Sequence, residues 1–357
     1  MMHGCGYSSN ISLSRLRDHR QVANAFSELA RRESQDPDIV VAALPTIELC
    51  AESVRFGLER GVPVLLDMRD MWPDIFVDSA PGPARPIARL MLRSMFSECR
   101  RACREATAII GITDEFVDWG LKRGDRSRTD LDRAFPFAFE PNALEPEQIA
   151  EAGEFWDKLG IAEKHDDLVA CFFGTMGRQL DIETVIRAAK ELHARSAPVR
   201  FVMCGVGDRL AEFREMARDC PNVVFPGWVA AAQIRVLMSR SSVGLDPLPG
   251  RYDFLATINN KALEYISAGL PVISSPREGV LYRLLKENEC GLSYEHGDAQ
   301  GLAACLHDLW NDPNKRGALA AGSTRLFSES FTFDRVYGSM MQHLMDVAGT
   351  PRVTAQA

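Results

Sequence analysis

The sequence contains no apolar run that approaches the roughly 20 residues needed to cross a bilayer. Its first residues lack a basic flank followed by an apolar core, so no secretory signal is recognised. Basic residues are not in excess either, since 41 Lys and Arg stand against 49 Asp and Glu, a net charge of −8. Nucleic-acid binding usually needs a basic face, which this charge opposes. Together these absences predict a cytoplasmic globular protein that does not bind nucleic acid.

Cysteine patterns of the kind that bind metals or form disulfide frameworks are also missing. The nine cysteines are odd in number, and Cys171 and Cys204 lie inside apolar runs, which favours buried free thiols in a reducing compartment. Cys99 and Cys103 have the spacing of one helix face, but no second His or Cys pair completes a zinc site. The sequence therefore predicts no metal and no cofactor.

What the sequence does contain is a repeated alternation of short apolar runs with helical segments. The chain of 357 residues exceeds one ordinary domain, so two domains are expected. The predicted strands are 38–44, 63–67 and 108–112 in the first half, and 168–173, 199–204, 222–225, 243–246, 271–274 and 291–294 in the second. Helices are predicted over 12–32, 86–104, 114–122, 182–195, 210–218, 233–239, 260–268 and 333–347. Nearly continuous apolar strands that alternate with helices indicate parallel sheets covered on both faces.

The alternation is interrupted from 125 to 166, where Pro, Glu and Asp are frequent and predict a linker with one short helix. We therefore predict an α/β protein with two Rossmann-like, doubly wound parallel-sheet domains and a cleft between them. Their bounds are 1–145 and 146–330. Residues 331–357 are predicted to form a helix that packs back across the interdomain hinge, followed by a loose tail.

Three strand-to-helix junctions of the second domain carry residues suited to a phosphorylated ligand. In open α/β sheets ligands bind beyond the carboxyl ends of the strands, where amides at helix N-termini favour phosphate. At the first junction Gly174 and Gly177 would let the backbone approach a diphosphate, while Thr175 and Arg178 add a hydroxyl and a positive charge. The alternative is an ordinary glycine-containing turn, which every α/β protein has.

The second junction opens a helix with the residues Asn259-Asn260-Lys261-Ala262-Leu263-Glu264. Asn259 suits an N-cap, Lys261 can neutralise phosphate, and Asn260 shares one helix face with Glu264. One carboxylate can accept hydrogen bonds from both hydroxyls of a ribose, so Glu264 suits a nucleotide. The alternative is a solvated helix start with surface Lys and Glu. The third junction, Gly205-Val206-Gly207, lacks the third glycine and the acidic residue of an NAD site.

The order of these pieces from Phe172 to Leu306 resembles the donor-binding domain of glycosyltransferase family 4. The matching segments are 173–175, 205–207, 222–229, 244–248 and 260–272. Glu264 falls where that family keeps the glutamate that holds the nucleotide ribose. The resemblance implies the two-domain GT-B fold and retaining transfer from a nucleotide sugar without a metal, UDP being favoured over GDP. The donor-binding residues so predicted are Gly174, Thr175, Arg178, Gly205, Trp228, Asn259, Asn260, Lys261 and Glu264.

A second resemblance lies in the first, acceptor-side domain. The turn Arg69-Asp70-Met71-Trp72-Pro73 is similar to one in the family branch that builds bacterial surface polysaccharides, including lipopolysaccharide, and that contains the N-acetylfucosamine transferases. Arg69 stands where many relatives have a histidine near the donor sugar, and Asp70 follows it, so both are predicted catalytic residues. An Arg–Asp pair that shapes the turn is the alternative. The family often has a further glutamate eight residues before Glu264, where this sequence has Ala256.

Two further expectations concern the acceptor-side domain. Related chains begin with a strand, a glycine-rich loop and a helix before the part matched here, so the first βαβ unit is expected to be missing. The stretch 86–104 mixes arginines with apolar residues. It is expected either to contact the inner face of the cell membrane, whose surface is anionic, or to pack its apolar side on the sheet.

The resemblance predicts the transfer of a hexose or N-acetylhexosamine from a nucleotide sugar to a saccharide or lipid-linked acceptor in cell-surface polysaccharide synthesis. Two alternatives remain open. One is a donor-binding but inactive remnant, which the short N-terminus favours. The other is a nucleotide-sugar epimerase of the same architecture.

Overall fold

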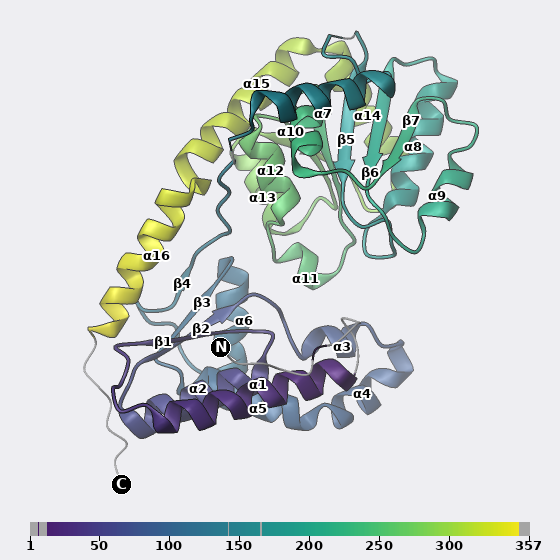
Figure 1. Cartoon of the computed structure of the whole chain (residues 1–357). Coiled ribbons are helices and arrows are strands. Elements are labelled where there is room, and N and C mark those ends of the chain that lie inside the picture. The colour runs from purple at the N-terminus through teal and green to yellow at the C-terminus, as the bar shows by residue number, and fades with distance from the viewer. Residues whose placement is uncertain (1–5, 7–12, 142, 165, 350–357) are drawn as a thin grey trace. The chain divides into compact units, whose positions relative to one another are not determined.

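The computed structural model describes residues 6, 13–141, 143–164 and 166–349 (Figure 1). The chain divides into two compact units, each with its own parallel sheet. Unit 1 contains residues 1–136 and 337–357, and unit 2 contains residues 137–336. The prediction of two parallel-sheet α/β domains is therefore confirmed. No helix in this described part of the chain is both long enough and apolar enough to span a membrane.

Unit 1 is built on a four-stranded sheet in the order β1-β2-β3-β4, in which every neighbouring pair is parallel. Its strands are β1 (Val40–Ala43), β2 (Val64–Met68), β3 (Ala108–Gly111) and β4 (Arg133–Ala134). Its helices are α1 (Leu13–Arg32), α2 (Ile47–Arg60), α3 (Asp74–Asp78), the short 3-10 helix η1 (Gly82–Ala84), α4 (Arg85–Met91), α5 (Arg93–Glu105) and α6 (Asp114–Gly124). All residues of β2 and β3 are buried, which explains their nearly continuous apolar sequences.

Two features of unit 1 differ from the prediction. The prediction of a single helix over 86–104 is wrong. The chain leaves helical geometry at Leu92 (φ −91°, ψ 8°), so this stretch forms two helices, α4 and α5. β4 lies inside the stretch expected to be a linker, and a two-residue strand is too short to leave a sequence pattern. Asp132, which is buried, anchors the chain just before β4. Its Oδ1 accepts a hydrogen bond from the Ile109 amide (2.8 Å), and its carboxylate pairs with Arg126.

The C-terminal helix α16 (Phe333–Ala348) begins at the end of unit 2, and from Tyr337 onward it belongs to unit 1. It contributes Met340, Leu344 and Val347 to an apolar cluster with Leu65, Ala108 and Ile110. The imidazole Nε2 of His343 lies 3.0 Å from the Leu131 carbonyl oxygen. This helix therefore supplies part of the apolar core next to β2 and β3.

Unit 2 contains a six-stranded parallel sheet in the order β10-β9-β8-β5-β6-β7. Its strands are β5 (Leu168–Phe173), β6 (Val199–Cys204), β7 (Val223–Gly227), β8 (Val243–Pro247), β9 (Val272–Ser275) and β10 (Gly291–Ser293). Its helices are α7 (Pro146–Lys158), α8 (Ile182–Ala194), α9 (Leu210–Met216), α10 (Ala231–Ser239), α11 (Tyr252–Leu255), α12 (Asn260–Ser267), α13 (Gly279–Glu287), α14 (Ala299–Asn311), α15 (Pro313–Leu326) and the π-helical turn η2 (Phe327–Phe331). The direction of strand order reverses between β5 and β8, and ligands of such sheets bind at this kind of switch point.

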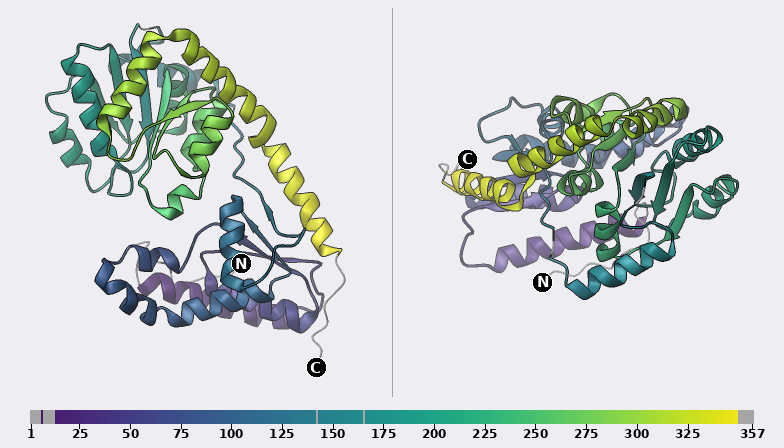
Figure 2. Two further views of the ribbon diagram at one scale, coloured as in Figure 1. Left: turned by 180° about the vertical axis from the view of Figure 1, so that it is seen from behind. Right: turned by 90° about the horizontal axis from the view of Figure 1, so that it is seen from above.

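The core of unit 2 lies on both faces of its sheet. Along β5, Val169, Cys171 and Phe173 join one apolar cluster, whereas Leu168, Ala170 and Phe172 join the other. Figure 2 shows helices on both faces of this sheet. The residues on both faces of β5 are therefore buried, as the continuous apolar run predicts.

The eight described cysteines are free, and seven of them are buried. Burial raises the pKa of the Cys171 thiol to about 12. A buried thiol of this kind behaves as a small apolar side chain, so the cysteines of unit 2 serve its packing.

Candidate functional site

The carboxyl ends of β5, β6 and β7 are joined by backbone hydrogen bonds that form one wall of the site. The Gly174 amide donates to the Cys204 carbonyl oxygen (3.1 Å), and the Gly205 amide donates to the Gly227 carbonyl oxygen (2.7 Å). Gly205 has φ +137°, and a Cβ atom built there would lie 1.8 Å from the Gly174 carbonyl oxygen. Only glycine lets the strand ends approach this closely.

Helix α12 begins next to this wall, since a Cβ built on Gly174 would lie 3.6 Å from Lys261 Cδ. Asn259 caps the helix through its Oδ1, which accepts from the Ala262 amide (3.0 Å). The Asn259 Nδ2 in turn donates to Oδ2 of Asp246, in β8. Lys261 lies in the first turn, with its Nζ 3.8 Å from Asp246 Oδ1.

Asp246 is therefore the residue that holds both the cap and the lysine in place. It is fully buried, and its Oδ1 has no hydrogen-bond partner among the residues that the structure describes. Burial raises the pKa of Asp246, while Lys261 and then Asn259 act in the opposite direction. In the sequence, the presence of Asp246 in a segment that resembles the family is the only signal for this role.

A cavity of about 370 Å³ opens at these strand ends. Six of the predicted donor-binding residues line it, namely Gly174, Thr175, Gly205, Trp228, Lys261 and Glu264. The remaining lining residues, which were not predicted, are Phe173, Cys204, Val206, Val229 and Ile234. They are apolar or weakly polar. Phe173, Cys204, Val206 and Val229 each adjoin a predicted residue in the sequence, which could have indicated them, whereas Ile234, in α10, left no such signal. The three predicted junctions thus meet at one cavity.

Three predicted donor-binding residues do not line this cavity. Asn259 acts through the helix cap, as described above. Asn260, the first residue of α12, is exposed, and Arg178 is exposed in the turn that follows Gly177. For these three residues direct contact with a ligand stays a prediction.

The charges in the cavity suit a ligand that carries both phosphate and hydroxyl groups. Lys261 stands in the first turn of a helix, where the backbone dipole also favours an anion. Glu264 is half-buried, and burial raises its pKa, which the nearby Lys261 opposes. The cavity therefore combines a cation and a helix N-terminus with one carboxyl group that can accept hydrogen bonds from hydroxyls.

Arg69 and Asp70 lie in unit 1, directly after β2, whereas every residue that lines the cavity belongs to unit 2. The Arg69 Nε donates to Oδ2 of Asp67 (2.6 Å), which is a buried residue of β2. The Asp70 Oδ1 accepts from the Met71 amide (2.9 Å). Burial raises the pKa of Asp67, and Arg69 opposes this rise. Asp67 as the partner of Arg69 was not predicted from the sequence.

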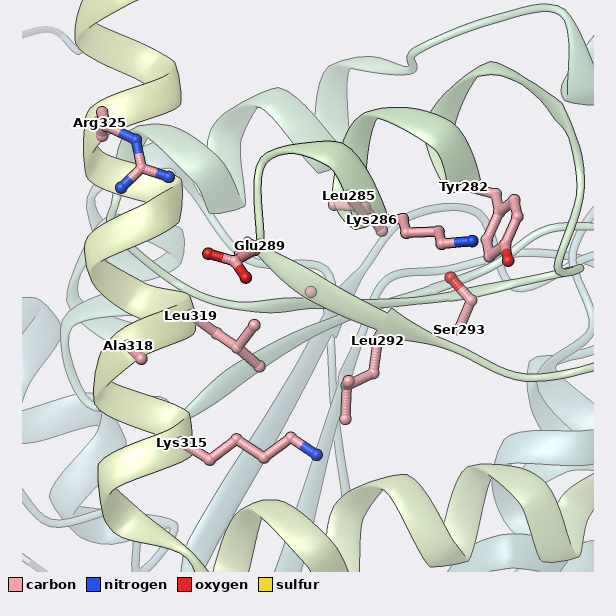
Figure 3. Close-up of a pocket in the computed structure, with 11 residues that line it drawn as sticks. Tyr282, Leu285, Lys286, Glu289, Leu292, Ser293, Lys315, Ala318, Leu319 and Arg325 are labelled. Atoms are coloured by element: carbon pink, nitrogen blue, oxygen red, sulfur yellow. The ribbon is translucent and has the colours of Figure 1, made fainter.

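A larger cavity of about 450 Å³ lies at the edge strand β10, between α13 and α15 (Figure 3). Its lining includes Lys286, Lys315 and Arg325, but among the described lining residues none comes from the three junctions. Two of these cations already have partners in the chain: Lys315 pairs with Asp308 (2.6 Å), and Arg325 donates to the Asn288 carbonyl oxygen (3.1 Å). The smaller cavity, where the three predicted junctions meet, is the better candidate for a phosphorylated ligand.

Comparison with known proteins gives a family match in unit 2. Residues 167–312 match the family described as glycosyl transferases group 1. The alpha-D-kanosaminyltransferase of Streptomyces kanamyceticus is 21% identical over 230 residues, which cover 64% of this chain and 57% of that protein. The match thus spans little more than half the length of this curated relative.

Solved structures with the same fold cover nearly the whole chain. HepE from Anabaena, in complex with UDP, aligns with a TM-score of 0.67 at 16% identity, over 95% of this chain and 85% of that one. Sucrose-phosphate synthase from Thermosynechococcus elongatus aligns with a TM-score of 0.69 at 17% identity, over 97% and 82% of the two chains. At these identities the likeness shows a shared fold, the two parallel-sheet α/β domains of the GT-B architecture.

Proposed function

We propose that this chain, whose residues 167–312 match the glycosyltransferase group 1 family, is a retaining glycosyltransferase. The donor is a nucleotide diphosphate sugar, linked to UDP and carrying a hexose or an amino sugar. The acceptor is a saccharide or a lipid-linked saccharide of cell-surface polysaccharide synthesis, including lipopolysaccharide. The observation that carries the proposal is that the three strand-to-helix junctions meet at one cavity, which Lys261 and Glu264 also line.

The diphosphate is assigned to the N-terminus of α12. Amides in the first turn of a helix lack acceptors within the helix, and of these the Ala262 amide is taken by Asn259. The amides of Asn260 and Lys261 would then face an anion together with the Lys261 ammonium group. As the sugar departs, this set would stabilise the negative charge that develops on the leaving diphosphate.

The nucleoside is assigned to the side of the cavity that carries Glu264. An ionised carboxylate can accept both ribose hydroxyls, one on each oxygen. Trp228, a residue that is 71% exposed, lines the same cavity and offers an aromatic face to the ligand. The complex of HepE with UDP supports a uridine nucleotide for this fold.

Arg69 and Asp70 are proposed to contact the substrate from unit 1. Arg69 is held by Asp67, so it presents a positioned guanidinium group at the end of β2. If it acts on the reacting sugar, Arg69→Gln lowers kcat and leaves the affinity for UDP unchanged. A loss of UDP affinity in this variant would instead place its role in donor binding.

The central test is calorimetric binding of UDP to the full chain and to Lys261→Ala and Glu264→Ala. Losing a charge-assisted hydrogen bond costs about 1.5–3 kcal/mol, so we expect Kd to rise at least tenfold in each variant. Lys286→Ala is the matched control, because this lysine lines the cavity at β10 instead. Unchanged affinity in both site variants would refute the assignment of the donor site.

Turnover is tested separately by following release of UDP from UDP-sugars, with and without a pool of saccharide acceptors. The proposal expects transfer that depends on an acceptor. Binding without any turnover would identify an inactive remnant, and conversion of the donor sugar without an acceptor would identify an epimerase.

A further inference from the structure

A cavity of about 390 Å³ lies between helices α1, α2 and α5 of unit 1. Helices α1 and α5 both pack against α2 (Figure 1). Each helix contributes one small side chain to the lining, namely Ala23, Ala51 and Ser97, so the space between the helices is not filled. The described lining shares no residue with the donor cavity of unit 2. The cavity is therefore a separate candidate site, beyond the proposed function.

The charged residues of this cavity lie at different depths. Glu48 is buried, with 9% of the residue exposed, whereas Arg20 and Arg101 are exposed. The two arginines come from different walls, because Arg20 belongs to α1 and Arg101 to α5. Arg20 opposes the rise that burial causes in the pKa of Glu48, so it is close enough to act on that charge. The cavity thus has a carboxyl group at its inner end and two cations at its mouth.

The carboxyl group of Glu48 lacks the partner that a buried acid needs. Its Oε2 makes no hydrogen bond among the residues that the structure describes. The Nδ1 of His19 lies 3.9 Å from this oxygen, which is too far for a hydrogen bond. Burial, and then Arg15, lower the pKa of His19, so its ring is uncharged near pH 7. Buried polar groups are nearly always paired, and an unpaired buried charge is costly, so Glu48 is the group that a ligand would satisfy.

The other carboxyl groups of the cavity already have partners in the chain. Glu52 pairs with Arg55, and Glu98 accepts a hydrogen bond from the Ser94 hydroxyl (3.1 Å). In the described part of the chain, no group of three or more His, Cys, Asp or Glu side chains could hold a metal ion. An organic cation is therefore the better partner for Glu48.

We propose that this cavity binds a small zwitterion, a molecule with one primary ammonium group and one phosphate or carboxylate group. The ammonium group would donate to the Glu48 carboxylate, and the acidic group would accept from Arg20 and Arg101 at the mouth. Charge-assisted hydrogen bonds of this kind are the strong ones, and the planar guanidinium group matches both acidic groups. A volume of about 390 Å³ lies in the range of small-molecule sites.

The arrangement also selects against ligands that carry only one of the two charges. A simple amine has to pass the two arginines, and a simple anion meets Glu48 at the inner end. Each lacks one favourable contact and faces one repulsive charge, and this combination gives specificity. Amino-sugar phosphates and free amino acids both carry the required pair of groups.

The test is calorimetric titration of the purified full chain with matched ligands. Glucosamine 6-phosphate and L-glutamine represent the two sources of a zwitterion, and the tighter of the two identifies the source. Glucose 6-phosphate lacks the ammonium group, and glucosamine lacks the phosphate. Each is expected to bind at least about tenfold more weakly than glucosamine 6-phosphate, since one charge-assisted contact is lost.

Two variants assign the groups of the ligand to residues. Glu48→Gln keeps the shape of the side chain and removes its charge, so it should weaken the zwitterion at least about tenfold and should not weaken glucose 6-phosphate. Arg20→Gln with Arg101→Gln should weaken both ligands. Hydrogen–deuterium exchange should show ligand-dependent protection in α1, α2 and α5, because binding stabilises the helices that form the site.

Controls separate this site from the donor cavity. Lys261→Ala, and Arg218→Gln on the surface of unit 2, should bind the zwitterion as the wild type does, and Glu48→Gln should bind UDP as the wild type does. Failure of both zwitterions to bind would overturn the proposal. So would binding that Glu48→Gln leaves unchanged, or binding that Lys261→Ala removes, because the ligand would then occupy the donor cavity. None of these results depends on whether UDP binds.

Discussion

The close approach of Gly205 to Gly174 predicts a graded response to alanine substitution. Gly205 has φ +137°, a region that costs a residue with a side chain about 1–3 kcal/mol. Its Cβ would also lie 1.8 Å from the Gly174 carbonyl oxygen, so the ends of β5 and β6 must separate, which adds a further ~1–3 kcal/mol of overpacking. We therefore expect Gly205→Ala to destabilise unit 2 by about 2–6 kcal/mol and to abolish detectable UDP binding.

Two other glycines of unit 2 separate backbone strain from collision. Gly297 has φ +79° but meets no described atom within 4 Å, so Gly297→Ala should cost only the strain, about 1–2 kcal/mol. Gly250 has neither a positive φ nor a neighbour within that distance, and Gly250→Ala should change stability by less than about 0.5 kcal/mol.

Hydrogen–deuterium exchange of peptides from β5 and β6 measures this effect in unit 2 alone. A loss of about 3 kcal/mol raises the population of the open form more than a hundredfold, so protection of both strands should fall sharply in Gly205→Ala and little in Gly250→Ala. The reasoning is refuted if Gly205→Ala exchanges as slowly as Gly297→Ala and still binds UDP, because the strand ends would then accommodate a side chain.

Two carboxyl groups with raised pKa values give opposite pH dependences. Burial raises the pKa of Glu264 above its ordinary 4.5. Because the ionised form accepts the ribose hydroxyls, UDP affinity should fall as pH drops through this raised value. The phosphate of UDP also titrates, so the difference between the pH profiles of the wild type and Glu264→Gln isolates the contribution of Glu264. In unit 1, burial raises the pKa of Glu48 above 4.5. The Oε2 of Glu48 has no hydrogen-bond partner among the described residues. Burial also lowers the pKa of the neighbouring His19. The folded state therefore binds the Glu48 proton more tightly than the unfolded state, so this residue's contribution to stability is present below the ordinary pKa and is lost as pH rises through the folded one. Chemical denaturation followed across pH should show that loss in the wild type, and Glu48→Gln should reduce it and stabilise unit 1 near neutral pH; an unchanged slope would contradict the burial argument.

Much of the fold of unit 2 was predictable because its strands are buried on both faces. The predicted strands 168–173 and 199–204 have the same bounds as β5 and β6, since a strand with helices on both sides needs an unbroken apolar sequence. The start of α12 was predictable for a different reason. Asn259 is a strong capping residue, and the structure shows its side chain accepting from the Ala262 amide.

The features that were not predictable depend on contacts between distant segments. No glycine or proline separates α4 from α5, so the break at Leu92 left no local signal. β4 exists because Asp132 holds it against β3 through the Ile109 amide. Asp246 can position Lys261 because the fold brings the end of β8 next to the start of α12, a contact that neither segment shows by itself.

The class of fold, the position of the glycine turns and the residue types available for a phosphate and a ribose could all be deduced from the order of the amino acids. These follow from local rules, because apolar runs, helix caps and positive-φ turns are each decided within a few residues. The folded arrangement was needed to show that Gly174, Gly205, Lys261 and Glu264 line one cavity. Arg178 and Asn260 are not among its lining residues. The strand order places the ends of β5, β6 and β8 together, and this order depends on the packing of the whole sheet rather than on any one segment.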